Sequence, residues 1–124
     1  MAVDIAVTLD RMGTDRLDLW LFHRDDDTVP VGELVDAAQR EVALGTIGAW
    51  GVSNWSAERV WEARSMADVA LPVATSPQFS LVDQLAEPWP GVTTSPGPAH
   101  AEESVRLADH GVAVIARPPL AGGY

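Results

Sequence analysis

Two side chains that can handle protons or negative charge follow short apolar runs in this chain. His23 comes directly after the run 17–22, and Arg117 comes directly after the run 112–116. An imidazole has an ordinary pKa of about 6.5 and exchanges protons near neutral pH, and a guanidinium can hold an enolate or a carboxylate. This pair predicts acid/base chemistry on a carbonyl compound, with His23 and Arg117 as the candidate catalytic residues.

Amides, a hydroxyl and aromatic rings occur near the ends of the same runs. Asn54 follows Ser53, and Gln78 lies further along the chain. Amide groups donate and accept hydrogen bonds, so Asn54 or Gln78 could polarise a carbonyl. Trp55 and Trp89 fall in expected loops on the same side, where each ring would either stack on a ligand or pack its own loop.

Several kinds of chemistry are excluded by composition. The chain has no cysteine and no lysine, which rules out thiolate sites, disulfides and a Schiff base. The acidic run 25–27 suggests a metal at first sight, but three adjacent carboxylates in a loop usually point apart into solvent. We therefore expect no metal site.

Strands and helices alternate in the expected secondary structure. Apolar runs predict strands at 17–22, 47–52, 73–76 and 112–116, and helical spacing predicts helices at 4–12, at 30–44, after an N-cap at Ser56 and at 99–110. Such alternation favours right-handed βαβ units and a parallel sheet, either open or part of a barrel. A long loop rich in proline and glycine is expected at 87–98.

The same patterns predict which side chains are buried. The run 17–22 has the composition of a strand buried on both faces, and Val105 and Leu107 are expected to point inward from their helix. Most of the charged residues of helix 30–44 are expected on its polar side; the set is Glu33, Asp36, Arg40 and Glu41. Trp61 is expected between its helix and the sheet.

Size and charge limit the classes of function. The 124 residues form one expected domain, 1–124, well short of the roughly 250 residues of a complete (β/α)₈ barrel. A formal charge of −10 disfavours nucleic acid and anionic membrane surfaces as partners. The sequence shows no apolar run long enough to span a bilayer and no basic, then apolar, leader, so a cytoplasmic location is expected.

Four short motifs, in order and in register, carry a family resemblance. They are Arg11-Met12-Gly13-Thr14-Asp15 leading into Asp18-Leu19-Trp20-Leu21-Phe22-His23-Arg24, then Gly51-Val52-Ser53-Asn54-Trp55, then Pro77-Gln78-Phe79-Ser80-Leu81, and Pro119-Leu120-Ala121-Gly122-Gly123. Together they resemble an aldo/keto reductase from its fourth to its seventh barrel strand. The resemblance implies an α/β fold, a partial (β/α)₈ (TIM) barrel of about four parallel strands with flanking helices.

The resemblance also implies roles for single residues. His23 matches the family histidine beside the substrate carbonyl, and Ser53, Asn54 and Gln78 match the residues that bind the nicotinamide carboxamide. Where the family usually has a stacking aromatic residue and then a serine, this chain has Arg117 and Pro118. We therefore expect weak NADP binding or none.

The family's catalytic Asp, Tyr and Lys come from earlier strands that this sequence does not show, and Tyr124 does not match that tyrosine. Three hypotheses follow. The first is a repurposed protein that catalyses a non-redox step, such as cyclisation, isomerisation or elimination, on a small carbonyl metabolite. The second is an NADPH-dependent reductase active only with a complementing chain, and the third is a non-catalytic binding module.

A bare parallel half-barrel would have unpaired edges at 17–22 and 112–116, neither protected by lysine, proline or a bulge. We expect a homodimer that covers them, either by closing one eight-stranded barrel or by an antiparallel or face-to-face arrangement that does not close a barrel.

Overall fold

A computed structural model describes residues 1–77 and 101–117 of the chain. In these two segments the elements run in the order α1 (Ala2–Met12), β1 (Leu17–Phe22), α2 (Val31–Leu44), β2 (Ile47–Ser53), α3 (Ala57–Met66), β3 (Ala74–Ser76), α4 (Ala101–Asp109) and β4 (Ala113–Val114). The predicted alternation of strands and helices is confirmed. The expected loop at 87–98 lies outside the described residues.

The four strands form one parallel sheet in the order β1-β2-β3-β4. Leu17 pairs with Ile47 and Phe22 with Val52, so β1 and β2 run side by side over nearly their full length. Strands in sequential order with helical crossovers are the repeating unit of a (β/α)₈ barrel. Within the described residues, β1 and β4 are the outer strands, as the sequence predicts.

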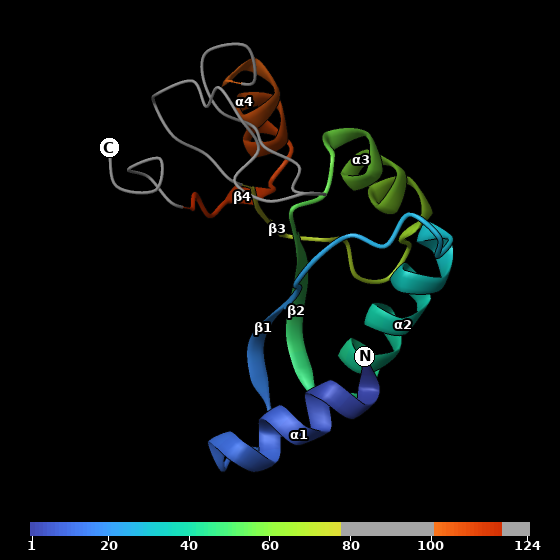
Figure 1. Cartoon of the computed structure of the whole chain (residues 1–124), viewed down its shortest axis with the longest axis vertical. Helices are drawn as coiled ribbons and strands as arrows, with labels where there is room; N and C mark the ends of the chain where they lie inside the picture. The colour runs from blue at the N-terminus through green and yellow to red at the C-terminus, as the bar shows by residue number, and fades with distance from the viewer. Residues whose placement is uncertain (78–100, 118–124) are drawn as a thin grey trace.

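Helices α2 and α3 lie on the same side of the sheet, and α1 crosses below the start of β1 and β2 (Figure 1). Trp50 and Val52, which point from β2 to the helical side, are fully buried. The Trp50 indole Nε1 donates to the Ala70 carbonyl oxygen at 2.7 Å, which satisfies its one donor. The core of the described chain therefore lies between the sheet and these helices.

The opposite face of the sheet is less covered. Side chains alternate between faces along a strand, so the register pair of Leu19 and Ala49 points away from Trp50. Leu19 is 39% exposed and Ala49 is half-buried. In a complete barrel this face lines the interior, where it would meet the other strands.

Helix ends follow signals that are visible in the sequence. Gly13 and Gly45 end α1 and α2 with φ of 63° and 77°, in the left-handed region that glycine adopts without a Cβ clash. Ser56 is the N-cap of α3, and its hydroxyl accepts from the Arg59 backbone N–H at 3.3 Å. These local signals set the helix lengths that bring each strand back parallel to the last.

Several burial predictions are wrong. In β1 only Leu17 is buried, because β1 is an outer strand of the described sheet. Val105 is 58% exposed, while Leu107 on the same helix is buried as expected. Glu41 is buried, because its Oε2 accepts from the Thr46 hydroxyl at 2.6 Å and so replaces water.

Two further predictions hold only in part. Strand β4 covers Ala113–Val114 rather than 112–116. Trp61 is half-buried, with its ring against the core but flanked by Arg64, Arg106 and the imidazole of His110 from α3 and the end of α4. Sequence periodicity places a residue on a helix face but does not say how many neighbours cover that face.

Candidate active site

Ser53, the last residue of β2, lies at the centre of a hydrogen-bond network at the carboxyl end of the sheet. Its hydroxyl donates to the Ser76 carbonyl oxygen at 3.1 Å and accepts from Asn54 Nδ2 at 3.2 Å and Arg117 Nη2 at 2.7 Å. A hydroxyl has one hydrogen and two lone pairs, so the Ser53 hydroxyl can form no further hydrogen bond. Ser53 is also 97% buried, being 3% exposed.

Arg117 bridges the ends of two strands through one edge of its guanidinium. Nη2 donates to Ser53, and Nε donates to the Ser76 hydroxyl at 3.0 Å. The Ser76 hydroxyl in turn donates to the Ile115 carbonyl oxygen at 2.9 Å. Ser53 and Ser76 pair with each other in the register of β2 and β3, so their side chains lie on the same face of the sheet. Thr75 precedes Ser76 and lines a pocket with residues of α3 and α4, so the two serines lie on the face away from these helices.

Asn54 connects this network to the end of β1. It has φ of 59°, in the left-handed region that asparagine tolerates better than most residues. This backbone turn lets Nδ2 donate both to Ser53 and to the His23 carbonyl oxygen at 3.3 Å, and lets the Asn54 backbone N–H donate to the Ser76 carbonyl oxygen at 3.2 Å. Predicted site residues from β1, β2 and β4 are thus joined by direct hydrogen bonds.

His23 itself presents an exposed side chain at this edge of the sheet. The loop that follows it is tied down by Arg59 of α3, whose Nε lies 2.7 Å from Asp25 Oδ2. Arg59 Nη2 also donates to the carbonyl oxygens of Asp26 at 3.2 Å and Val29 at 3.1 Å. A single side chain therefore holds three points of the loop that carries His23.

The Asp25–Arg59 pair lies where water has limited access. Each side chain is 19% exposed, and Asp25 Oδ1 has no hydrogen-bond partner among the described residues. Burial raises the pKa of Asp25 from its ordinary value, more than the neighbouring Arg59 charge lowers it. By contrast, hydrogen bonds from the Thr28 hydroxyl and backbone N–H lower the pKa of Asp26.

Trp55 packs beside this pair rather than at an open surface. The ring is 3% exposed, with the Arg59 guanidinium 5.2 Å from its centroid and the Phe22 ring centroid at 6.0 Å. Of the two alternatives left open by the sequence, the structure shows loop and core packing for this ring. Its role in ligand stacking stays a prediction that needs a rearrangement.

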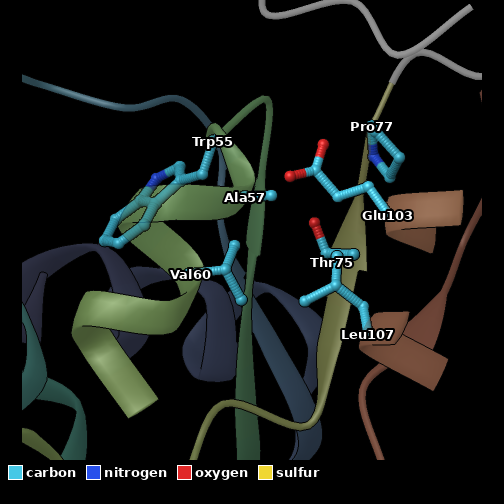
Figure 2. Close-up of a pocket in the computed structure, with 7 residues that line it drawn as sticks. All are labelled: Trp55, Ala57, Val60, Thr75, Pro77, Glu103 and Leu107. Carbon is cyan, nitrogen blue, oxygen red and sulfur yellow. The ribbon is translucent and has the colours of Figure 1, made fainter. Parts of the chain in front are cut away.

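A small pocket lies between α3 and α4, and Figure 2 shows Glu103 reaching from α4 toward Ala57. Thr75 and Leu107 form its floor, and its free volume is about 10 Å³. This is close to the least volume that holds one water molecule. The pocket therefore cannot take a metabolite in this arrangement, and it lies on the helical side, away from Arg117.

Sequence reasoning missed two members of the site. Ser76 was expected only as a strand residue, and Arg59 only as part of a helix. The position of Ser76 at the end of a predicted strand was a usable signal. Nothing local to Arg59 indicates its contacts, because its partners lie 30 and 33 residues away. Predicted site residues Gln78 and Trp89 lie outside the described residues.

Within 1–77 and 101–117, no group of three or more His, Cys, Asp or Glu is arranged to hold a metal ion. No helix in those segments is long and apolar enough to cross a bilayer. Asp25 and Asp26 instead bind Arg59 and Thr28, respectively.

The sequence of this chain matches a family model described as the aldo/keto reductase family, over residues 2–124. The chain belongs to the aldo/keto reductase family. The resemblance noted in the sequence is thus confirmed, and so is the partial (β/α)₈ fold.

Individual relatives agree with this family. An aldo-keto reductase of Babesia bovis is 30% identical over 102 residues, which are 80% of this chain and 32% of that protein. A protein of Oryza sativa subsp. japonica described as a voltage-gated potassium channel beta subunit is 36% identical over 77 residues, 60% of this chain and 24% of that protein. This aldo/keto reductase chain therefore spans about a quarter to a third of these relatives.

Solved structures show the same relationship. A thermostable aldo-keto reductase in complex with epalrestat superposes with a TM-score of 0.79 at 25% identity, covering 97% of this chain and 39% of that one. An aldo/keto reductase from Klebsiella pneumoniae in complex with NADP and acetate has a TM-score of 0.72 at 26% identity, covering 94% of this chain and 36% of that one.

The family implies a nicotinamide cofactor, but the Ser53 hydroxyl and the Asn54 Nδ2 group, which would face its carboxamide, are already hydrogen-bonded within the protein. The Ser53 hydroxyl is fully used, and both hydrogens on Asn54 Nδ2 are donated within the protein. Arg117 would have to release Ser53 before that hydroxyl could bind any other group. In the described part of this aldo/keto reductase chain, the Ser53 hydroxyl and the Asn54 Nδ2 hydrogens are therefore used within the protein.

Proposed function

We propose that this chain catalyses a non-redox acid/base step on a small carbonyl compound, such as an isomerisation, a cyclisation or an elimination. The observation that supports this best is the bond from Arg117 to Ser53, because it uses the hydroxyl to which the family resemblance assigns the nicotinamide carboxamide. A positively charged guanidinium there suits a substrate that carries or develops negative charge.

His23 is the proton-transfer residue in this proposal. Its imidazole takes a proton from the carbon next to the carbonyl. The C–H bonding electrons form a carbon–carbon double bond, and the carbonyl π electrons move onto the oxygen to give an enolate. The enolate then takes the proton back at another atom, or expels a leaving group from the neighbouring carbon. Arg117 offsets the negative charge. No hydride moves, so no nicotinamide is consumed.

Exchange of carbon-bound hydrogen for deuterium tests the proton step without knowledge of the natural substrate. Pyruvate and hydroxyacetone are incubated with the protein in deuterated buffer near neutral pH, and loss of their methyl and methylene proton signals is followed by NMR. His23→Gln removes the base, so we expect the rate above buffer to fall about 100-fold or more.

His110→Gln is the matched control. This second histidine is exposed at the end of α4, where its Nδ1 lies 2.8 Å from the Arg106 carbonyl oxygen, and it is not part of the site. The control should exchange at the wild-type rate. Equal exchange by wild type and His23→Gln, or steady NADPH consumption that depends on an added aldehyde, would overturn the proposal.

A second candidate function is NADPH-dependent reduction with a complementing chain. One observation favours it: the face of the sheet that carries Leu19 and Ala49 is the one that lines a complete barrel, and this chain covers 36% of a reductase solved with NADP. Restored NADPH oxidation on adding a chain that supplies the missing strands would support it. In that complex, Arg117 must give up its bond to Ser53.

The expected homodimer belongs to the same proposal. A second copy would pair its β1 with β4 of the first, which removes both outer edges of the described sheet and covers the face that carries Leu19. Both copies of His23 would then lie at one mouth. The expectation of a cytoplasmic location stays a prediction.

A further inference from the structure

We propose that Arg117 forms a carboxylate-binding site, so that the substrate is a small oxo acid rather than a neutral aldehyde or ketone. This inference rests on the proposed function for its catalytic meaning, but the binding site itself stands on separate geometry. In that geometry, Ser53 and Ser76 accept hydrogen bonds from some of the guanidinium N–H groups and leave the others free.

A guanidinium carries five N–H groups on a rigid plane. Nε–H and one Nη2–H form a fork along one edge, and here both are donated, to the hydroxyls of Ser76 and Ser53. A second fork remains at the tip, made of the other Nη2–H and one Nη1–H. Within the described residues, this second fork has no hydrogen-bond or ion-pair partner.

The free fork matches a carboxylate in shape. Two parallel N–H groups bind the two oxygens of a carboxylate at once, whereas a single enolate or carbonyl oxygen would use only one of them well. The remaining Nη1–H points to the other edge and can donate to a neighbouring carbonyl oxygen. A compound with a carboxylate next to a ketone therefore uses more of these donors than a neutral ketone.

The two serines also hold the fork in place before any ligand arrives. An unattached arginine loses considerable side-chain freedom when it binds a ligand. Here Ser53 is buried and fixed by Ser76 and Asn54, so the guanidinium is anchored to a rigid point. Preorganised donors of this kind raise affinity because the ordering cost is met by the fold.

Among the described residues, neither ion pair involves Arg117. The chain has a formal charge of −10, yet the ion pairs among described residues are Met1–Asp4 and Asp25–Arg59. Arg117 is exposed at the carboxyl end of the sheet, on the edge where the His23 side chain is also exposed. A carboxylate bound there would leave the rest of a small substrate within the same region of the sheet as His23.

Calorimetric titration with pyruvate and with its neutral amide, pyruvamide, tests the site. We expect wild type to bind pyruvate at least about tenfold more tightly than pyruvamide, and Arg117→Lys to lose that preference, because lysine keeps the charge but not the fork. Ser53→Ala should weaken pyruvate binding by an intermediate factor, since it frees Nη2. Thermal melts of each variant identify any that do not fold.

Arg106→Lys is the matched control, because Arg106 is exposed on α4 beside Trp61 and away from the sheet end. Its pyruvate affinity should equal that of wild type. Equal binding of pyruvate and pyruvamide by wild type, or an unchanged preference in folded Arg117→Lys, would show that Arg117 is only a clamp between strands.

The two proposals fail separately. Deuterium exchange of hydroxyacetone without any preference for pyruvate in binding would overturn the carboxylate site and keep the acid/base function. Tight pyruvate binding that depends on Arg117, with no exchange of either compound, would keep the site and overturn the function.

Discussion

Arg117 Nη2 lies 2.7 Å from the Ser53 hydroxyl oxygen, although the two residues are 64 positions apart. They follow β4 and end β2, which are not neighbours in the sheet because β3 lies between them. The guanidinium therefore ties together strands that no backbone hydrogen bond connects. Any change at Ser53 should be felt both in stability and at the candidate site.

Ser53→Ala should lower the free energy of unfolding by about 1–3 kcal/mol. The substitution leaves one N–H of Asn54 Nδ2 and one N–H of Arg117 Nη2 without an acceptor in a place where Ser53 is 3% exposed. Urea denaturation followed by tryptophan fluorescence measures the change. Ser65→Ala, at an exposed position on α3, serves as control and should change stability by less than about 0.5 kcal/mol.

Gly51→Ala should destabilise the fold by about 1–3 kcal/mol, because a Cβ at Gly51 would run into the Ala74 carbonyl oxygen and lie 2.8 Å from Leu21 Cδ2. The carbonyl is backbone of the neighbouring strand and cannot turn away. Gly32→Ala is a control of opposite sign. It lies inside α2 with 3.7 Å to Met66 Sδ, so it should gain about 0.5–1 kcal/mol. Equal melting temperatures for the two variants would contradict the close approach of Gly51 to the Ala74 carbonyl oxygen.

Arg59→Ala should loosen the loop after His23. Arg59 binds Asp25 and the carbonyl oxygens of Asp26 and Val29, so its loss leaves these acceptors to water. Hydrogen exchange at the Val29 amide, which donates to the Asp26 carbonyl oxygen at 3.1 Å, should speed up about tenfold or more. Arg24→Ala, an exposed arginine in the same loop, should leave that rate unchanged.

Stability should depend on pH through Asp25 in an unusual direction. Burial raises the pKa of Asp25 in the folded state above its ordinary value of 3.8, so the folded chain binds this proton more tightly than the unfolded chain. The contribution is then fully present below pH 3.8 and is lost as pH rises through the higher folded value. The stability of wild type relative to Asp25→Asn should fall as pH rises through this range. If the stability of wild type relative to Asp25→Asn instead increases with pH, the Arg59 charge lowers the pKa of Asp25 more than burial raises it.

Light scattering at micromolar concentration should give a mass of about twice the 13.2 kDa of one chain. A second copy is expected because the described sheet has β1 and β4 as outer strands and Leu19 on it is 39% exposed. Leu19→Asp should shift the population toward the monomer, because it places a charge on the sheet face that the second copy would cover. A monodisperse wild-type monomer of 13.2 kDa would refute the homodimer.

The sequence by itself determined the order of strands and helices, the family and the ends of most elements. These depend on local signals, such as Gly13 and Gly45 in left-handed caps, Ser56 as N-cap and the apolar run of β1. Each is encoded within a few residues of where it acts, so one sequence suffices to find it.

The tertiary structure alone decided how the candidate site is connected. It placed Arg117 on Ser53 and Ser76, Arg59 on the loop after His23, and the Trp55 ring in the core. It also left Val105 exposed where helical spacing favoured burial. These contacts join residues that are tens of positions apart, and local patterns carry no information on which distant strand end a long side chain will reach or how much surface a neighbouring element will cover.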